Sequence, residues 1–99
     1  MVYVRIGCPV CQTGVLGIRR CSDGRSLVVM CDECEDVWAS PEDLDVQSVL
    51  EAEAPAFRIE LLGVAIAGEA AGWANEAEVV TKGWSSFVQG VQQDAESST

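Results

Sequence analysis

The two segments Cys8-Pro9-Val10-Cys11 and Cys31-Asp32-Glu33-Cys34 are the stretches of this 99-residue chain that decide its fold. Residues 12–30 separate them, a spacing typical of zinc sites built from two Cys-x-x-Cys pairs. Each pair can form a tight knuckle that directs two thiolates toward one point, and two knuckles complete a tetrahedral set of sulfur ligands. The sequence therefore predicts a closed, structural metal site. Its ligands are Cys8, Cys11, Cys31 and Cys34.

Zinc is the metal that we expect, and iron is the alternative, because tetrahedral sulfur sites hold both. Redox iron sites of this kind usually keep glycine and small residues around the sulfur atoms. Here Gln12 and Glu35 follow the second cysteine of each pair, which favours zinc. A dithiol redox function of Cys8 and Cys11 would need a βαβ context and a helix that starts at the first cysteine, and the sequence indicates neither.

The first forty residues predict a β-hairpin that carries the two cysteine pairs. Residues 2–6 alternate and are rich in β-branched and aromatic side chains, which indicates a short strand. Asp23-Gly24 is a strong turn signal between two extended segments, 15–21 and 26–30, and the second of these delivers Cys31. The predicted fold class is α+β, with an N-terminal zinc ribbon over residues 1–40 followed by a small α/β appendage with a C-terminal helix.

The predicted appendage is an acidic α/β extension over residues 41–92, packed on the ribbon. Ser40-Pro41, followed by acidic residues, is a helix-start signal, and residues 57–61 alternate as a strand would. The topology of residues 57–75 stays open. Residues 93–99 are polar and predict a frayed tail.

Two helical segments are predicted toward the C-terminus. Asn75 is a natural N-cap for a helix that ends at Gly83. A further apolar stripe has the spacing i, i+3, i+4, i+7, which is typical of one helix face. Its members are Trp84, Phe87, Val88 and Val91.

Part of the chain resembles a known family. Residues 31–38, followed by Pro41-Glu42-Asp43-Leu44, resemble the second half of the small zinc-ribbon domains of the transcription-factor-IIB type found in many bacterial proteins. Cys8-Pro9-Val10-Cys11 with Gly14 is similar to their first knuckle. The resemblance covers residues 7–45 and implies metal binding with protein or nucleic-acid contacts, and no single activity. The chain departs from the family at Gln12 and Glu35, where glycine is common.

Charge is distributed unevenly along the chain. The net charge is −10, and residues 41–99 hold two basic against eleven acidic side chains, a net of −9. Such a surface repels phosphate backbones and attracts a basic protein. The alternative is that the acidity serves solubility alone. The residues that we expect at a partner surface are Glu42, Asp43, Asp45, Glu51, Glu53, Trp73, Glu76 and Glu78.

No catalytic site is predicted. The chain has no histidine, and a closed zinc site holds no activated water. We therefore expect a non-catalytic zinc-binding protein-interaction module, such as an immunity or inhibitor protein that binds a basic toxin or nuclease. The alternatives are a transcription- or nucleic-acid-associated ribbon, suggested by Arg19, Arg20 and Arg25, and a redox or metal-handling protein.

Two further residues carry structural expectations. Cys21 is the odd cysteine, and we expect it to act as a small buried hydrophobe, with a reactive thiol or exchanging ligand as the alternative. Trp38 is expected to cover the metal site. An odd number of cysteines fits a reducing cytoplasm, and neither a signal peptide nor an apolar run of ~18 residues is present to predict a membrane span.

Overall fold

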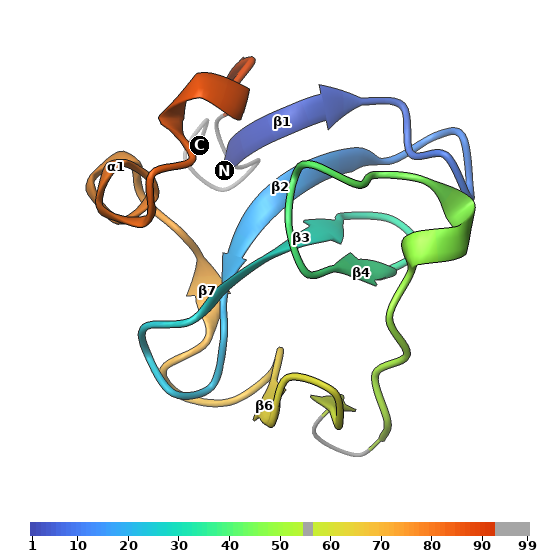
Figure 1. Cartoon of the computed structure of the whole chain (residues 1–99), viewed down its shortest axis with the longest axis vertical. Coiled ribbons are helices and arrows are strands. Elements are labelled where there is room, and N and C mark those ends of the chain that lie inside the picture. The colour runs from blue at the N-terminus through green and yellow to red at the C-terminus, as the bar shows by residue number, and fades with distance from the viewer. Residues whose placement is uncertain (55–56, 93–99) are drawn as a thin grey trace, which may run out of the picture.

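The computed structural model describes residues 1–54 and 57–92, so the predicted tail lies outside the described residues. Its main element is an antiparallel sheet in the order β4-β3-β2-β1-β8, in which β7 also pairs with β2 (Figure 1). Five strands of this sheet run as β1 (Val2–Ile6), β2 (Val15–Arg20), β3 (Leu27–Cys31), β4 (Val37–Trp38) and β8 (Gly90–Val91). β7 spans Gly72–Trp73, and a separate two-stranded hairpin consists of β5 (Arg58–Ile59) and β6 (Val64–Ala65). With one α-helix in the part of the chain that the structure describes, the architecture is α+β.

The predicted first strand and β-hairpin are confirmed. β2 and β3 pair from Leu16 opposite Cys31 to Arg20 opposite Leu27. The Asp23 carboxylate holds the turn between them by accepting hydrogen bonds from the backbone N–H groups of Arg25 and Ser26, at 3.0 and 2.8 Å, and from the Ser26 hydroxyl. The hydrogen bonds from Ser26 are the main reason that the pKa of Asp23 is lowered to about 2. The carboxylate therefore stays ionised and keeps the turn closed.

Strands from the second half of the chain join this hairpin in one sheet. β7 pairs with β2, with Trp73 opposite Arg19, and β8 pairs with β1, with Val91 opposite Val2. The domain boundary at residue 40 stays a prediction. Strand pairs nevertheless join residues 1–40 to residues 41–92 by backbone hydrogen bonds.

The predicted helix that begins at Ser40 is wrong. This segment forms turns and one short 3₁₀ helix, η1 (Val46–Ser48), which Asp45 caps by accepting a hydrogen bond from the Ser48 N–H at 2.8 Å. Beyond it, Leu50 pairs with Val37 of β4 and donates its N–H to the Val37 carbonyl at 2.7 Å. A helix would withdraw Leu50 from this contact, so pairing with the sheet decides the conformation.

The predicted helical stripe from Trp84 to Val91 is also wrong. The structure has a 3₁₀ helix, η2 (Ser85–Phe87), and then β8. The edge of β1 explains the difference, because it binds this segment through its backbone. The backbone N–H of Gln89 donates to the Tyr3 carbonyl at 2.9 Å, and the backbone N–H of Gln92 donates to the Met1 carbonyl at 2.8 Å. Apolar spacing alone does not reveal a free strand edge, and the edge determines the outcome here.

The helix predicted after Asn75 is confirmed as α1 (Glu76–Lys82). Asn75 and Glu78 form a complete capping box, and Gly83 ends the helix in the left-handed conformation with φ of 84°. The predicted strand over residues 57–61 is confirmed only at Arg58–Ile59, where the chain turns back into β6. Among the described residues, none of the helices has the length and apolar character that crossing a membrane requires.

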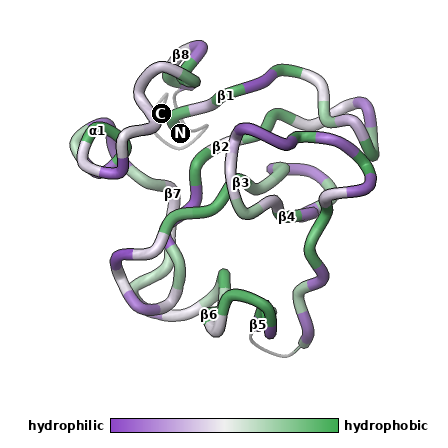
Figure 2. The backbone as a smooth tube through the Cα atoms, in the orientation of Figure 1, coloured by the Kyte–Doolittle hydropathy of each residue, from purple (hydrophilic) through white to green (hydrophobic). Residues whose placement is uncertain are grey.

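The core consists of two apolar clusters. Figure 2 shows apolar stretches over β3 and the β5–β6 hairpin. Trp38 is fully buried in the cluster that also contains Cys8 and Cys31, and its indole Nε1 donates to the Asp45 carbonyl at 2.8 Å. Cys21 is fully buried in the second cluster, as predicted, and burial raises the pKa of its thiol to about 11. At neutral pH Cys21 is therefore a neutral thiol without access to solvent.

Candidate metal centre

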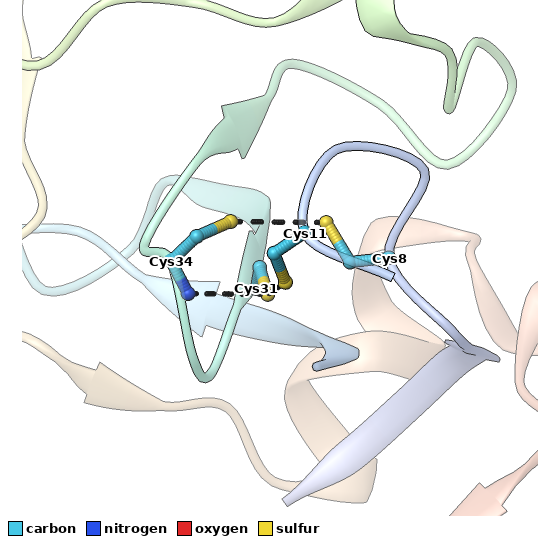
Figure 3. A group of neighbouring side chains, drawn as sticks. All are labelled: Cys8, Cys11, Cys31 and Cys34. Atoms are coloured by element: carbon cyan, nitrogen blue, oxygen red, sulfur yellow. Dashed lines mark hydrogen bonds between the residues drawn. The ribbon is translucent and has the colours of Figure 1, made fainter. Parts of the chain in front are cut away.

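Two loops bring the four predicted ligands together. Cys8 and Cys11 lie in the loop between β1 and β2, while Cys31 ends β3 and Cys34 lies in the turn toward β4 (Figure 3). All four Sγ atoms lie within 4.8 Å of one another. The Sγ atoms of Cys8 and Cys34 are 3.7 Å apart, as are those of Cys11 and Cys31. The closest contacts thus join the two loops.

These distances fit a metal site and exclude disulfides. A disulfide needs a sulfur–sulfur distance of about 2.05 Å, and all five cysteines are free. Metal–sulfur bonds of about 2.3 Å in a tetrahedron give edges of about 3.8 Å, close to the two distances of 3.7 Å. Cys8 and Cys31 are buried, while Cys11 and Cys34 are more accessible. The residues present therefore form a candidate site for a structural metal ion.

Backbone hydrogen bonds shape the two loops as knuckles. The Gly14 carbonyl accepts from Gly7 and Cys8, both at 3.0 Å, and closes the first loop. The N–H groups of Val10 and Glu33 lie 3.4 Å from the Sγ atoms of Cys8 and Cys31, in equivalent places of the two knuckles. Such bonds stabilise a thiolate, because they favour the charged form.

A reciprocal contact fastens the loops to each other. Asp32 donates its backbone N–H to the Val15 carbonyl at 3.1 Å and accepts from the Val15 N–H through its carboxylate at 2.8 Å.

The thiols of Cys11, Cys31 and Cys34 differ in acidity. Hydrogen bonds from the backbone and hydroxyl of Thr13 lower the pKa of Cys11 to about 6. Burial raises the pKa of the Cys31 and Cys34 thiols. A metal ion must displace the protons of these thiols, so its affinity is expected to fall as the pH decreases.

Gln12 and Glu35, which follow the second cysteine of each pair, adopt a backbone conformation that favours glycine. Their φ angles are 65° and 63°, in the left-handed region. This conformation costs a non-glycine residue roughly 1–2 kcal/mol. Each knuckle therefore carries backbone strain at the residue that follows its second cysteine.

Replacing Gln12 with glycine is expected to stabilise the metal-loaded protein by about 0.5–1 kcal/mol, since relief of the left-handed strain exceeds the entropy that glycine adds to the unfolded chain. Chemical denaturation measures the change. Val10 of the same knuckle has no positive φ, so Val10→Gly is the control and should destabilise. Equal destabilisation by both substitutions would contradict the interpretation.

Replacing Gly14 with alanine is expected to weaken metal binding roughly 10–100-fold. This range is typical of substitutions that disturb a residue supporting a metal ligand. A Cβ at Gly14 would overlap the Sγ of Cys31 and approach the Glu33 Cβ to 3.1 Å. Competition with a chelator measures the affinity. Gly72→Ala is the control. The atoms nearest to a Cβ added at Gly72 belong to the flexible end of the Arg20 side chain, so metal affinity should stay unchanged. Unaltered binding in Gly14→Ala would contradict the clash.

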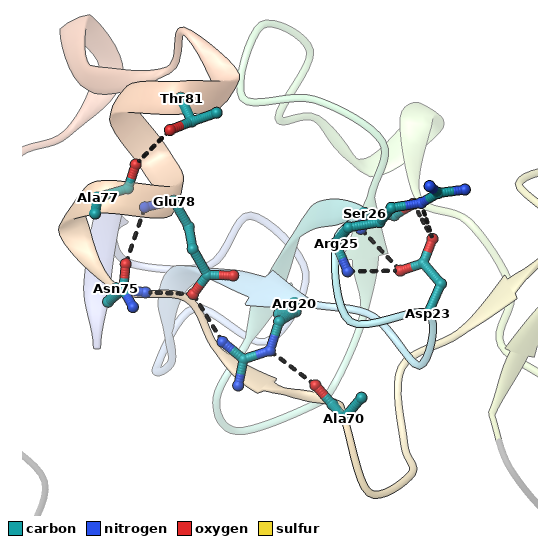
Figure 4. Close-up of polar contacts among 9 residues, drawn as sticks. All are labelled: Arg20, Asp23, Arg25, Ser26, Ala70, Asn75, Ala77, Glu78 and Thr81. Carbon is teal, nitrogen blue, oxygen red and sulfur yellow. Dashed lines mark hydrogen bonds and ion pairs between the residues drawn. The ribbon is translucent and has the colours of Figure 1, made fainter.

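The predicted partner residues lie in several segments of the fold, and their role stays a prediction. Glu42 and Asp43 lie in the loop before η1, Glu51 and Glu53 in an extended segment, and Glu76 in the first turn of α1. The other three are occupied within the chain. Asp45 caps η1, Trp73 is half-buried beneath the guanidinium of Arg19, and Glu78 accepts from Arg20 and from the Asn75 N–H (Figure 4).

The arginines of the hairpin have structural roles that the sequence did not indicate. Arg19 donates to the Ile66 carbonyl at 3.1 Å. Arg20 pairs with Glu78 at 2.7 Å and donates to the Ala70 carbonyl at 2.7 Å. Both side chains thereby hold residues 66–78 against β2. Arg25 is mostly exposed, with 88% of its side chain accessible.

The sequence also did not predict a hollow that lies beside the metal centre. Glu35 and Asp36, which follow Cys34, meet Glu51 and Glu53 around it. The run of acidic residues after the second knuckle was the only available signal, and it does not reveal which later residues lie opposite.

Comparisons with known proteins identify one relative and no family. No family model matches the chain, and no solved structure matches it. Over 91 residues, 87% of the chain, it is 25% identical to the Uncharacterized protein L48 of Acanthamoeba polyphaga mimivirus and spans 76% of that protein. The resemblance to transcription-factor-IIB-type ribbons therefore stays a prediction.

Proposed function

We propose that this chain is a non-catalytic, zinc-stabilised protein-interaction module that binds a basic protein. The observation that carries the proposal is the convergence of four cysteine Sγ atoms within 4.8 Å. Four thiolates around one ion are typical of structural zinc and leave no position for substrate. The two knuckles at the ends of antiparallel strands support a zinc-ribbon assignment for this part of the chain. Thiolate ligands also suit a reducing cytoplasm, where we place the protein.

The charge of the chain supports a basic partner. The net charge is −10, and four thiolates around a divalent ion would make the knuckle region more negative still. An acidic surface of this kind steers association with basic proteins. An inhibitor or immunity protein for a basic toxin or nuclease is the form of this function that we favour. The structural use of Arg19 and Arg20 supports a protein partner over a nucleic acid.

Native mass spectrometry tests the metal. Protein purified without added metal is expected to carry one zinc ion and to lose it, with its folded charge-state distribution, on treatment with a strong chelator. A holo protein that contains iron, or an apo protein with the same fold, would contradict the structural zinc centre.

Affinity capture tests the partner. The metal-loaded chain is used as bait, and its matched control has carboxylates from several parts of the surface, Glu42, Glu51, Glu53 and Glu76, replaced by the corresponding amides. We expect capture of a protein with a basic isoelectric point that is released by salt and retained less by the control. Capture that depends on neither salt nor the carboxylates would contradict the proposal.

A further inference from the structure

The four ligands of the candidate metal centre differ in their access to solvent. Cys8 and Cys31 are buried, with 2% and 0% of their surface exposed. Cys11 is half-buried, and Cys34 is exposed. Because the oxidation of a thiolate depends on its exposure, Cys11 and Cys34 are the positions at which an oxidant can attack the centre.

Each accessible sulfur atom lies beside a buried one that belongs to the other loop. The Sγ atom of Cys34 is 3.7 Å from that of Cys8, and the Sγ atom of Cys11 is 3.7 Å from that of Cys31 (Figure 3). A sulfur atom that is oxidised at the surface therefore has a second thiolate beside it. Redox-sensitive cysteines are often placed in this way next to a resolving cysteine, which completes a disulfide.

The residues around Cys34 determine which oxidants can approach it. Both neighbours of Cys34 in the chain, Glu33 and Glu35, are exposed. The segment 32–36 carries four carboxylates, from Asp32, Glu33, Glu35 and Asp36. These charges repel a negatively charged oxidant such as glutathione disulfide, whereas a small neutral peroxide is not repelled.

We propose that the metal centre is a redox-sensitive switch. Hydrogen peroxide converts its four thiolates into two disulfides that join the loops, Cys8–Cys34 and Cys11–Cys31, and the zinc ion is released. This inference rests on the proposed function, because it concerns the regulation of the same zinc centre. It goes beyond that function by naming the oxidant and the pairs of sulfur atoms that react.

The reaction takes place in two steps for each pair of cysteines. The accessible thiolate attacks one oxygen atom of the peroxide, the O–O bond breaks, hydroxide leaves, and the sulfur becomes a sulfenic acid. The buried thiolate then attacks this sulfur atom, so the S–S bond forms and the S–O bond breaks with loss of a second hydroxide. Two peroxide molecules accept the four electrons that the four thiolates lose. Zinc requires deprotonated thiolates as ligands, so the disulfides no longer hold it.

The test uses the full-length, zinc-loaded chain and hydrogen peroxide. A chromogenic zinc indicator measures the released metal, and peptide mapping by mass spectrometry identifies the disulfides. We expect zinc release together with the Cys8–Cys34 and Cys11–Cys31 disulfides. Cys21 is fully buried in the second cluster, so it is the internal control and should stay a free thiol. Disulfides within the knuckles, Cys8–Cys11 and Cys31–Cys34, would overturn the pairing between the loops.

A pair of variants tests the selection of the oxidant. Replacing Glu33 and Glu35 with glutamine removes two charges beside Cys34 and leaves all four ligands in place. At low salt, this variant should release zinc about threefold faster than the unaltered chain in glutathione disulfide, with no change in peroxide. The control replaces Glu69 and Glu76, which are exposed and lie outside the knuckles, and both of its rates should stay unchanged. Equal acceleration in the two variants would overturn selection by the second knuckle.

The outcomes separate this inference from the proposed function. Native mass spectrometry first verifies that the chain and each variant carry zinc. A zinc-loaded chain that keeps its metal and its reduced cysteines in peroxide would overturn the switch and leave the structural zinc centre standing. Sulfinic acid at Cys11 or Cys34 without any disulfide would overturn the role of the buried partners. If the purified chain holds no zinc, both proposals fail.

Discussion

Replacing Cys31 with serine is expected to abolish metal binding and to unfold the chain at room temperature. Structural zinc contributes an apparent ~10–16 kcal/mol in small zinc-binding peptides, whereas domains of ordinary size are stable by about 5–15 kcal/mol. Cys31 is fully buried, ends β3, and lies 3.7 Å through its Sγ atom from that of Cys11 in the other loop. Its loss therefore removes both a ligand and one of the contacts between the loops. Native mass spectrometry measures bound zinc, and circular dichroism measures the fold.

Cys21 provides the matched control for this experiment. It is equally buried, but it lies in the second apolar cluster, away from the four ligands. Cys21→Ala is expected to retain one zinc ion and to lose only about 1–2 kcal/mol, as for deletion of a small buried group. If Cys31→Ser kept zinc and the native spectrum, or if Cys21→Ala lost the metal, the ligand set would be wrong.

Replacing Trp38 with alanine is expected to lower the free energy of unfolding by about 3–5 kcal/mol, the usual cost of a cavity left by a large aromatic side chain. Trp38 is fully buried, and it packs in the cluster that contains Cys8 and Cys31. Its indole N–H also holds the loop before η1 by donating to the Asp45 carbonyl at 2.8 Å. Urea denaturation followed by far-ultraviolet circular dichroism measures the loss.

Trp38→Phe separates the two contributions of this side chain. Phenylalanine keeps most of the buried apolar surface but cannot donate to Asp45. This variant should lose the hydrogen bond, worth about 0.5–1.5 kcal/mol, and a smaller packing term, so its total loss should stay below that of alanine. An alanine variant as stable as the phenylalanine variant would show that packing around the metal centre does not depend on Trp38.

Local signals in the sequence predicted those elements whose residues are close along the chain. The Asp23-Gly24 turn, the two cysteine knuckles and the Asn75 cap each depend on contacts within a few residues. The predictions failed where a distant strand offered hydrogen bonds. Leu50 extends beside Val37, although the helix-start signal at Ser40 indicated a helix there. Residues 89–92 pair with β1, although the apolar spacing from Trp84 indicated a helix. Helix propensity is a weak preference, and pairing with an existing sheet outweighs it.

The candidate metal centre also has features that the sequence predicted and features that depend on the tertiary structure. Cysteine spacing alone identified Cys8, Cys11, Cys31 and Cys34, because two knuckles of this spacing have one sterically simple way to share an ion. The acidic surface could not be predicted in this way. Sequence counts the carboxylates, but only the folded chain shows that Glu78 is paired with Arg20, and that Glu51 and Glu53 line the same hollow as Glu35 and Asp36.

The sequence by itself thus determined the four sulfur ligands, the β-hairpin that carries them and the negative charge of the protein. The tertiary structure decided which carboxylates stay accessible, where the C-terminal segments add to the sheet, and that residues 49–53 lie beside the second knuckle. The physical reason is the range of the interactions. Turns, caps and knuckles depend on neighbouring residues, whereas sheet edges and surface charge depend on residues that folding brings together from distant parts of the chain.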